Sequence, residues 1–330
     1  MVKRPLRLLA AFLFLTLPAS ASGDEVADLK ITTLSTMLAD LQGIGEWGYA
    51  ALVETENGTF LFDTGERPRT VLQNAREIGV DLSLVEEVIL THHHFDHTGG
   101  LVTLRDELSQ QQPTALVRTH VAEGMFLPRE IDLEALAQMP VRPPQELLVS
   151  VLDVKARYEA LGGEFIVHDG PRELAPGVWV TGPIPRVHPE RNWTRFEKIR
   201  GEEGLLEDTI PEDQAMVIVT AKGLVVIVGC GHAGIVNTLE AARSIAPGVP
   251  VHAVMGGFHL LNQTDEQVAW SGEKMHEFGV QHLIGAHCTG VNAVAGLREA
   301  AGLTRETSVV GSVGTVFTLG EGIRSGALNR

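Results

Sequence analysis

The sequence predicts an α/β fold in which β-sheets are covered by helices on their outer faces. Two stretches of the chain carry this prediction. Residues 49–62 alternate apolar and polar side chains around an Asn57-Gly58 pair, a pattern typical of a β-hairpin closed by a primed turn. From residue 216 onward, short apolar runs alternate with segments of helical spacing. Strands flanked by helices on both sides imply sheets whose outer faces are covered.

Before the last third of the chain, one helix and one strand stand out. Apolar residues over 69–78 follow helical spacing, and Gly79 stands where a C-terminal cap is expected. A strand is predicted at residues 88–90. The segments near 120–150 and 183–213 are rich in Pro and charge and lack clear periodicity, so we expect long functional loops there.

The last third holds the densest run of regular elements. Strands are predicted at residues 216–219, 224–228, 251–255, 282–284 and 315–317, and helices near 234–244, 265–278 and 291–301. We find no internal repeat of short period.

The N-terminus is typical of a secretory signal peptide. Residues 1–7 are basic, residues 8–17 are apolar, and the segment ends in Ala19-Ser20-Ala21. A membrane anchor is the alternative, but the apolar run is shorter than the roughly 20 residues that span a bilayer. We therefore predict cleavage near Ala21, a periplasmic or secreted protein with no stable membrane anchor after cleavage, and a single domain over residues 22–330.

The mature chain is predicted to be strongly acidic. The full sequence has a formal charge of -16, and removal of Lys3, Arg4 and Arg7 with the signal peptide leaves -19. Nucleic-acid-binding proteins usually carry a basic surface, so this charge argues against a nucleic-acid partner and favours a small-molecule substrate. With 44% hydrophobic residues and only Cys230 and Cys288 as cysteines, the chain is an ordinary globular protein rather than a disulfide scaffold. Nothing in the sequence indicates its oligomeric state.

The chemistry is centred on the segment 92–97, His-His-His-Phe-Asp-His, directly after the predicted strand. Residues two apart on an extended chain point the same way, so His92 and His94 can bind one ion while His93 points away. Asp96 and His97 follow where the chain turns and can serve a second ion. Four histidines and an aspartate within six residues are hard to explain as core or as a solvated face. We therefore predict one or two metal ions, with Zn²⁺ favoured by imidazole and carboxylate ligands and with iron or manganese as alternatives.

These residues carry a resemblance to a known family. The pattern His-x-His-x-Asp-His after an apolar strand, preceded by Phe62-Asp63-Thr64-Gly65, resembles the signature of the metallo-β-lactamase superfamily. Further segments resemble its branch of dihydropterin-ribofuranosylaminobenzene 5'-phosphate synthase-like proteins: Pro185-Arg186, Glu212-Asp213-Gln214-Ala215, Gly229-Cys230-Gly231-His232, Gly256-Gly257-Phe258-His259 and His287-Cys288-Thr289-Gly290. The resemblance spans about residues 30 to 318 and implies a four-layer αββα sandwich, the metallo-β-lactamase fold.

The metal ligands that the resemblance implies are His92, His94, Asp96, His97, His232 and His287. As catalytic residues we expect Asp96, which would position or deprotonate water, and His259. His259 has three alternatives: a metal ligand, a substrate contact or a hydrogen-bonded structural histidine. Arg186 lies in a loop expected to overhang the site and is a candidate to bind a phosphate or carboxylate, with a solvated surface role as the alternative.

Two features depart from the wider superfamily. Many members carry an aspartate that bridges two metals where this chain has Cys230-Gly231-His232, so the site holds a second ion weakly or uses Cys230. The usual Gly-His-Thr segment is not visible, and His188 is a poor candidate to replace it. Cys230 and Cys288 are buried thiols, thiolate ligands or a disulfide. Asp63 fits either a carboxylate that orients a ligand histidine or a turn-forming residue.

The sequence thus predicts a hydrolase in which metal-activated water attacks a small, anionic substrate. One alternative is a metal-assisted condensing synthase acting on dihydropterin and phosphoribosyl substrates, which export argues against. The other is a non-hydrolytic redox protein that binds iron, which the same fold can host. Nothing in the motifs selects the bond that is cleaved.

Overall fold

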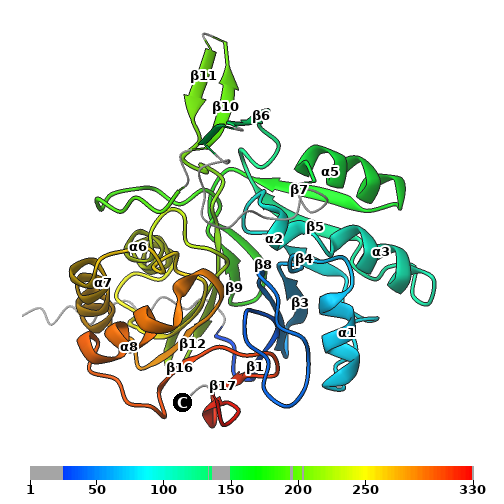
Figure 1. Cartoon of the computed structure of the whole chain (residues 1–330). Coiled ribbons are helices and arrows are strands. Elements are labelled where there is room, and N and C mark those ends of the chain that lie inside the picture. The colour runs from blue at the N-terminus through cyan, green and yellow to red at the C-terminus, as the bar shows by residue number, and fades with distance from the viewer. Residues whose placement is uncertain (1–24, 133, 136–148, 194–195, 203, 329–330) are drawn as a thin grey trace, which may run out of the picture.

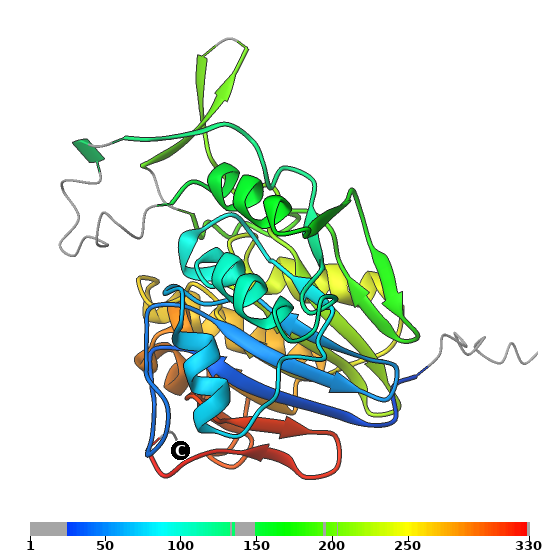
Figure 2. The ribbon, with the colours of Figure 1, turned by 90° about the vertical axis from the view of Figure 1, so that its right-hand side faces the viewer.

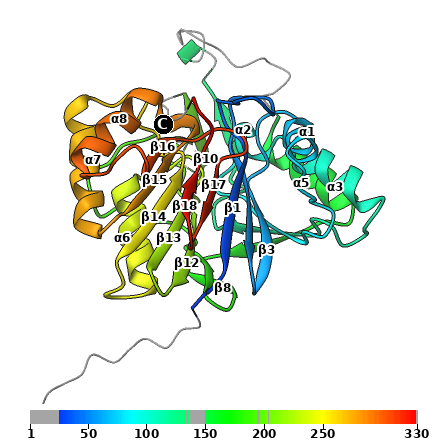
Figure 3. The same cartoon turned by 90° about the horizontal axis from the view of Figure 1, so that it is seen from below.

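Two β-sheets pack face to face in the computed structural model, and helices cover the outer face of each (Figure 3). The structure describes residues 25–328 except 133, 136–148, 194–195 and 203, so the predicted signal peptide lies outside the described residues. The four-layer αββα arrangement confirms the predicted fold class.

The first sheet has eight strands in the order β18-β17-β1-β2-β3-β4-β5-β7. Its strands are β1 (Leu29–Ser35), β2 (Ala50–Thr55), β3 (Gly58–Phe62), β4 (Glu87–Ile89), β5 (Arg118–Ala122), β7 (Glu164–His168), β17 (Val316–Thr318) and β18 (Gly322–Arg324). The outer face of this sheet is covered by α1 (Thr70–Glu77), α3 (Leu101–Ser109) and α5 (Val151–Ala160) (Figure 1). The run β3-β4-β5-β7 is parallel, so β3, β4 and β5 all end at the same edge.

The second sheet has seven strands in the order β16-β15-β14-β13-β12-β9-β8. Its strands are β8 (Arg172–Ala175), β9 (Val178–Val180), β12 (Ala215–Thr220), β13 (Gly223–Val228), β14 (Val251–Gly256), β15 (His282–Gly285) and β16 (Ser308–Val310). The run β13-β14-β15-β16 is parallel, which again brings several strand ends to one edge.

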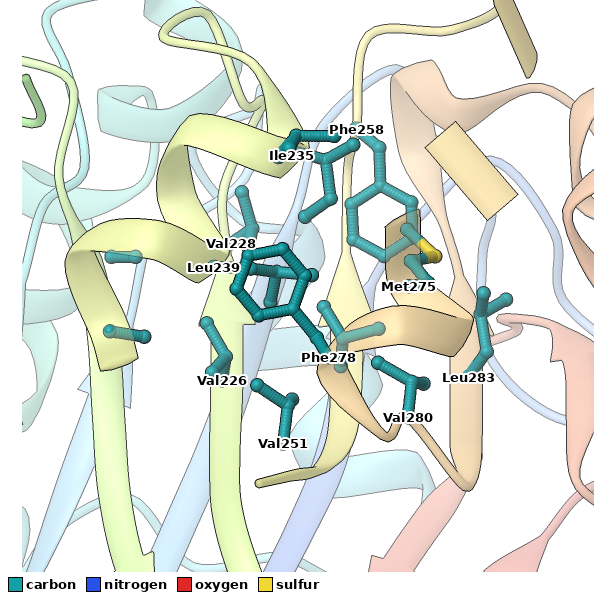
Figure 4. Packing of buried hydrophobic residues seen from close by; sticks show 14 of the residues in the cluster. Val226, Val228, Ile235, Leu239, Val251, Phe258, Met275, Phe278, Val280 and Leu283 are labelled. Atoms are coloured by element: carbon teal, nitrogen blue, oxygen red, sulfur yellow. The ribbon is translucent and has the colours of Figure 1, made fainter. Parts of the chain in front are cut away.

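The helices α6 (Ile235–Ile245), α7 (Asp265–Phe278) and α8 (Val291–Ala300) cover this second sheet. Their apolar faces meet the sheet in a buried cluster in which Leu239, Phe258, Met275 and Phe278 pack together (Figure 4). Burial of a large apolar side chain of this kind stabilises the fold by about 1.5–3 kcal/mol. The predicted helix at 265–278 is confirmed, and its Thr264 side chain forms a capping box with Gln267.

One buried side chain links the two sheets at the edge where the parallel strands end. Gln214, directly before β12, donates its side-chain amide to the carbonyl oxygens of Leu90, at 2.9 Å, and His120, at 3.3 Å. Its backbone N–H donates to the carbonyl oxygen of Thr91 at 3.1 Å. This attaches the start of β12 to the residues that lead from β4 into the histidine segment.

A small third sheet stands outside the sandwich (Figures 1 and 2). It contains β6 (Arg129–Ile131), β10 (Glu197–Gly201) and β11 (Gly204–Glu207) in the order β11-β10-β6. The prediction of long loops near 120–150 and 183–213 is wrong for these strands. They escape prediction because β11 is exposed and β10 is only partly buried, so no alternation of buried and exposed residues marks them.

The hairpin of β2 and β3 is confirmed, but its predicted primed turn is wrong. Thr55 pairs with Gly58, so the two loop residues are Glu56 and Asn57, and neither has the positive φ that a primed turn requires. The Thr55 hydroxyl instead accepts a hydrogen bond from Asn57 N–H at 3.1 Å and donates to the Gly58 carbonyl oxygen at 2.9 Å.

Within the part of the chain that the structure describes, none of the helices has both the length and the apolar character needed to span a bilayer.

Candidate metal centre

The predicted ligands converge at the edge where parallel strands of both sheets end. His92, His94, Asp96 and His97 follow β4 and lie in or next to the short helix α2 (Phe95–Thr98). The remaining histidines come from the second sheet: His232 after β13, His259 after β14 and His287 after β15. Carboxyl ends of parallel strands are the usual place for ligands in α/β folds.

A first group of histidines consists of His92, His94 and His232. The ring centroids lie 4.5 Å apart for His92 and His94, 4.7 Å for His92 and His232, and 4.8 Å for His94 and His232. His232 is therefore the third histidine of this group, and the absent Gly-His-Thr segment is not needed. Burial and the neighbouring histidines hold the pKa of both His92 and His232 well below the usual value, so these rings are neutral, as metal ligands must be.

A second group consists of Asp96, His97 and His287. Asp96 Oδ2 lies 3.3 Å from His287 Nε2 and 3.9 Å from His97 Nε2, and the two imidazole centroids are 5.0 Å apart. Although burial opposes it, His97 and His287 hold the pKa of Asp96 well below its usual range. Asp96 also lies within 4.8 Å of ligand atoms of His92 and His94, so its carboxylate stands between the two groups.

Outer contacts orient three of the rings through Nδ1. His97 Nδ1 is 2.7 Å from Asp63 Oδ2, His232 Nδ1 is 2.5 Å from the Asn192 carbonyl oxygen, and His92 Nδ1 is 3.0 Å from the Thr91 hydroxyl oxygen. A ring that donates from Nδ1 keeps the lone pair of Nε2 available for a metal.

The Nε2 atoms of four rings give an independent test of whether a metal fits. Among the described residues, His92, His97, His232 and His287 have buried Nε2 atoms without a hydrogen-bond partner; the contact of His287 Nε2 with Asp96 at 3.3 Å is not aligned for a hydrogen bond. Buried polar atoms in proteins are nearly always satisfied, and four in one cluster require a common explanation. A divalent cation would satisfy them together, so the residues present fit a metal.

Asp63 orients the ring of the predicted ligand His97, which is one of the two roles that the sequence suggests for it. Its carboxylate is fully buried and accepts hydrogen bonds from Thr91 N–H at 2.8 Å and from the Thr91 hydroxyl at 2.9 Å, besides the contact with His97. It adopts a φ of 53°, and His259 and His287 have φ values of 49° and 46°. Left-handed backbone at a non-glycine residue costs of order 1–3 kcal/mol, and its recurrence at three site residues is typical of functional sites.

The two cysteines lie together beside the histidines. Cys230 Sγ is 2.9 Å from Cys288 Sγ and 3.4 Å from His259 Nδ1, and both thiols are buried and free. Burial and the adjacent Cys288 raise the pKa of the Cys230 thiol. His259 lies next to the first group, with its ring centroid 4.6 Å from that of His232.

His93 points away from both groups, as the sequence predicted. Its Nδ1 lies 2.7 Å from Glu212 Oε1, and Glu212 is also paired with Arg129 at 2.7 Å. Although burial lowers it, hydrogen bonds to Glu197 and Glu212 raise the pKa of His93 to about 9. His93 is thus a buried cation that anchors the loop rather than a ligand.

Glu197 at the start of β10 is a site residue that sequence reasoning missed. Its Oε2 lies 2.9 Å from His94 Nε2 and its Oε1 lies 3.6 Å from His93 Nε2. The third sheet therefore delivers a carboxylate to the rim of the centre, and with Nε2 facing Glu197 it is Nδ1 of His94 that would be available to an ion. No local pattern marks Glu197, because its partners lie 103 residues away in the sequence.

Arg186, the candidate substrate-binding residue, contacts the protein itself. Its guanidinium donates to the carbonyl oxygens of Thr209 and Ile210 and lies over the ring of Trp193, 5.6 Å from the centroid. These contacts fix the connection between the third sheet and β12.

The chain matches the Metallo-beta-lactamase superfamily over residues 48–248, which is more than half of its length. It is also 29% identical over 284 residues to the 7,8-dihydropterin-6-methyl-4-(beta-D-ribofuranosyl)-aminobenzene-5'-phosphate synthase of Methanocaldococcus jannaschii. That match covers 82% of this chain and 90% of the relative.

Two solved structures share the fold. Tm1679, described as a metal-dependent hydrolase of the beta-lactamase superfamily, has a TM-score of 0.67 and 22% identity, over 88% of this chain and 98% of that chain. Zn²⁺-bound PqqB from Methylobacterium extorquens has a TM-score of 0.51 and 15% identity, over 87% of this chain and 99% of that chain.

Proposed function

This chain belongs to the metallo-beta-lactamase superfamily, and from that premise we propose that it is a metal-dependent hydrolase acting on a small, anionic substrate. The observation that carries the proposal is the pair of adjacent ligand groups with four buried, unpartnered Nε2 atoms among the described residues. Members of this superfamily generally bind divalent metals. Imidazole and carboxylate ligands favour Zn²⁺ here, and the zinc of the PqqB neighbour supports that choice.

A divalent metal bound here would lower the pKa of water so that hydroxide is available near neutral pH, and would polarise the bond to be cleaved. The side chains of this protein would hold the metal and position the water. Asp63 and the Asn192 carbonyl hold the histidines, and Asp96, between the two groups, is placed to position water or to accept its proton. His259 Nδ1 lies 3.4 Å from Cys230 Sγ, which leaves Nε2 as the nitrogen that would contact the substrate.

The proposed substrate is a small molecule because the surface repels polyanions. The formal charge of the full chain is -16, which disfavours nucleic acid. A small anion would be attracted by the metal charge itself, since Arg186 is committed to backbone carbonyls. We further propose that the protein is exported and loses residues 1–21, which would place its substrate outside the cytoplasm.

A second candidate function is a condensing synthase. It is favoured by the 29% identity to the Methanocaldococcus jannaschii synthase, whose name describes a phosphate-bearing aminobenzene product. The same metal centre would then polarise a leaving group without adding water to the product. Proposed export argues for hydrolysis, because phosphoribosyl substrates are made in the cytoplasm.

The test begins with metal content of the purified full chain by elemental analysis, followed by a panel of phosphoesters, thioesters, lactones and amides. Turnover in ¹⁸O-labelled water separates the two candidates, because a hydrolase places the label in its product and a condensing synthase does not. An iron-containing protein with a visible absorption spectrum and no turnover on the panel would instead support a redox role. A protein that binds no divalent metal would overturn the proposal.

A further inference from the structure

We infer that the thiolate of Cys230 is a ligand shared by two metal ions and stands between the two histidine groups. This inference rests on the proposed function, because both require a metal centre. It specifies how the two ions are joined and which class of metal the centre accepts.

The position of the sulfur carries the inference. Cys230 Sγ forms one set of potential ligand atoms with His92 and His232, all within 4.8 Å of one another. It forms a second such set with His97 and His287. The first pair belongs to the first histidine group and the second pair to the second group, so one sulfur lies within reach of both ion positions.

The nitrogens around this sulfur need a partner. The Nε2 atoms of His92, His97, His232 and His287 are all buried, and within the described residues none has a hydrogen-bond partner. Cys230 is itself only 2% exposed. A buried thiol ringed by four unpartnered imidazole nitrogens is the arrangement expected when a cation is the missing partner on each side.

The backbone holds the sulfur at this place. Cys230 lies between Gly229 and Gly231 in the turn after β13. A Cβ on Gly229 would meet the Thr91 hydroxyl and would lie 2.6 Å from Asp63 Oδ2, so only glycine allows the turn to approach the orienting carboxylate so closely. This close approach fixes the backbone of the turn beside Asp63 and thereby the starting point of the Cys230 side chain.

Cys288 lies on the far side of Cys230 and does not share this position. Its Sγ belongs to a set with Cys230 and His259 alone, accepts a hydrogen bond from His259 N–H at 3.3 Å, and donates to the Cys230 carbonyl oxygen at 3.4 Å. Cys288 therefore supports the turn, and it provides a matched control because it is an equally buried thiol 2.9 Å from the first.

The chemistry of a shared thiolate differs from that of a shared carboxylate. On binding, the thiol would lose its proton to solvent, and the sulfur would replace one water molecule of each hydrated ion. Thiolate is a soft ligand that favours zinc and cobalt, whereas manganese and magnesium prefer oxygen. The centre should therefore select zinc over manganese more strongly than an aspartate-bridged site would.

The test uses the full chain, purified with reduced thiols and loaded with zinc or Co²⁺. We expect about two ions per chain and a near-ultraviolet thiolate-to-cobalt charge-transfer band in the unmodified protein. Cys230→Ser should lose the band and retain roughly one ion, because loss of the shared ligand opens both shells and only the first group still offers three histidines. Cys230→Asp should lose the band, keep about two ions and bind Mn²⁺ more tightly than the unmodified protein does. Cys288→Ser should keep both the ions and the band.

A band that survives Cys230→Ser and disappears in Cys288→Ser would overturn the inference in favour of Cys288. Two bound cobalt ions without a band, or a disulfide between Cys230 and Cys288 in the metal-loaded protein, would overturn it while leaving the proposed function intact. An unmodified protein that binds neither zinc nor cobalt would overturn the proposed function as well. The Cys230→Asp variant and a circular dichroism spectrum separate loss of a ligand from failure to fold.

Discussion

Replacement of Asp63 by Asn should weaken metal binding without removing any metal ligand. The carboxylate accepts a hydrogen bond from His97 Nδ1–H at 2.7 Å and two from Thr91, and this holds His97 with Nε2 directed to the second group. The asparagine amide has the same shape but only one acceptor oxygen. If that oxygen stays with Thr91, the NH₂ group faces His97 Nδ1 and donates to it. Nδ1 must then be the unprotonated nitrogen, so the ring proton sits on Nε2, whose lone pair a metal needs.

The expected magnitude follows from comparable contacts behind metal-bound histidines. Loss of such a carboxylate weakens metal affinity by about 10- to 100-fold, which equals about 1.4–2.7 kcal/mol of binding free energy. The assay is competition for zinc with a chromophoric chelator, combined with chemical unfolding of the metal-free protein. We also expect a loss of about 1.5–3 kcal/mol in the free energy of unfolding, because a buried hydrogen bond to a charged group is broken.

Glu87→Gln is the matched control for this change. Glu87 also hydrogen-bonds a histidine, His120 Nε2 at 2.8 Å, and it lies on β4, but it belongs to neither ligand group. It should lower stability and leave zinc affinity within about twofold of the unmodified protein. Equal zinc affinities for Asp63→Asn and the unmodified protein would refute the reasoning. Equal losses of zinc affinity in Asp63→Asn and Glu87→Gln would show that the effect comes from general destabilisation of the fold.

Four further outcomes are expected. The double variant His92→Ala, His94→Ala should lose metal and activity while remaining folded, and stoichiometric metal by elemental analysis would contradict this. His232→Ala and His287→Ala should each weaken one ion and strongly reduce turnover with little change in circular dichroism, whereas unchanged metal stoichiometry in both would confine the site to residues 92–97. The pKa of His93 is raised from 6.5 to about 9 by its carboxylate partners, so its contribution to the stability of the metal-free protein is present below about pH 6.5 and is lost as the pH rises through about 9. His93→Gln should therefore flatten the stability profile over that range, and an unchanged slope in urea unfolding would exclude the assignment. Limited proteolysis should release no independently folded halves, because the ligands come from both sheets.

The elements that sequence reasoning found are those whose burial repeats along the chain. The strands β12 to β15 and the helices α6 to α8 have one apolar face against a large core, so their periodicity is visible locally. The strands β10 and β11 have no such face, because β10 is only partly buried and β11 is exposed, so their residues show no periodic pattern. The turn after β2 was misjudged because Asn57-Gly58 matches a primed turn, whereas the Thr55 hydroxyl favours a turn centred one residue earlier.

The site was predictable to the extent that its residues adjoin strand ends. The histidine segment and the Gly-flanked His232 could be placed at one edge because each directly follows an apolar strand. Contacts between segments that are distant in the sequence could not be predicted. Glu197 contacts His94, which lies 103 residues away in the sequence. His232 is held by the backbone carbonyl of Asn192, and a backbone contact leaves no side-chain pattern in the sequence. For Cys230, the sequence left a buried thiol, a ligand or a disulfide open, and its position within reach of both groups required the assembled structure.

The third sheet is structurally separate from the segments that carry the predicted metal ligands. The ligand groups lie on segments that follow sandwich strands, whereas β6, β10 and β11 stand outside the sandwich (Figure 2). Glu197 of β10 brings a carboxylate to the rim of the centre. Substitutions in the third sheet would change the rim of the centre without altering the segments that carry the predicted metal ligands. Substrate preference could therefore change through the third sheet while the metal ligands stay the same, because a fold by itself does not fix a function.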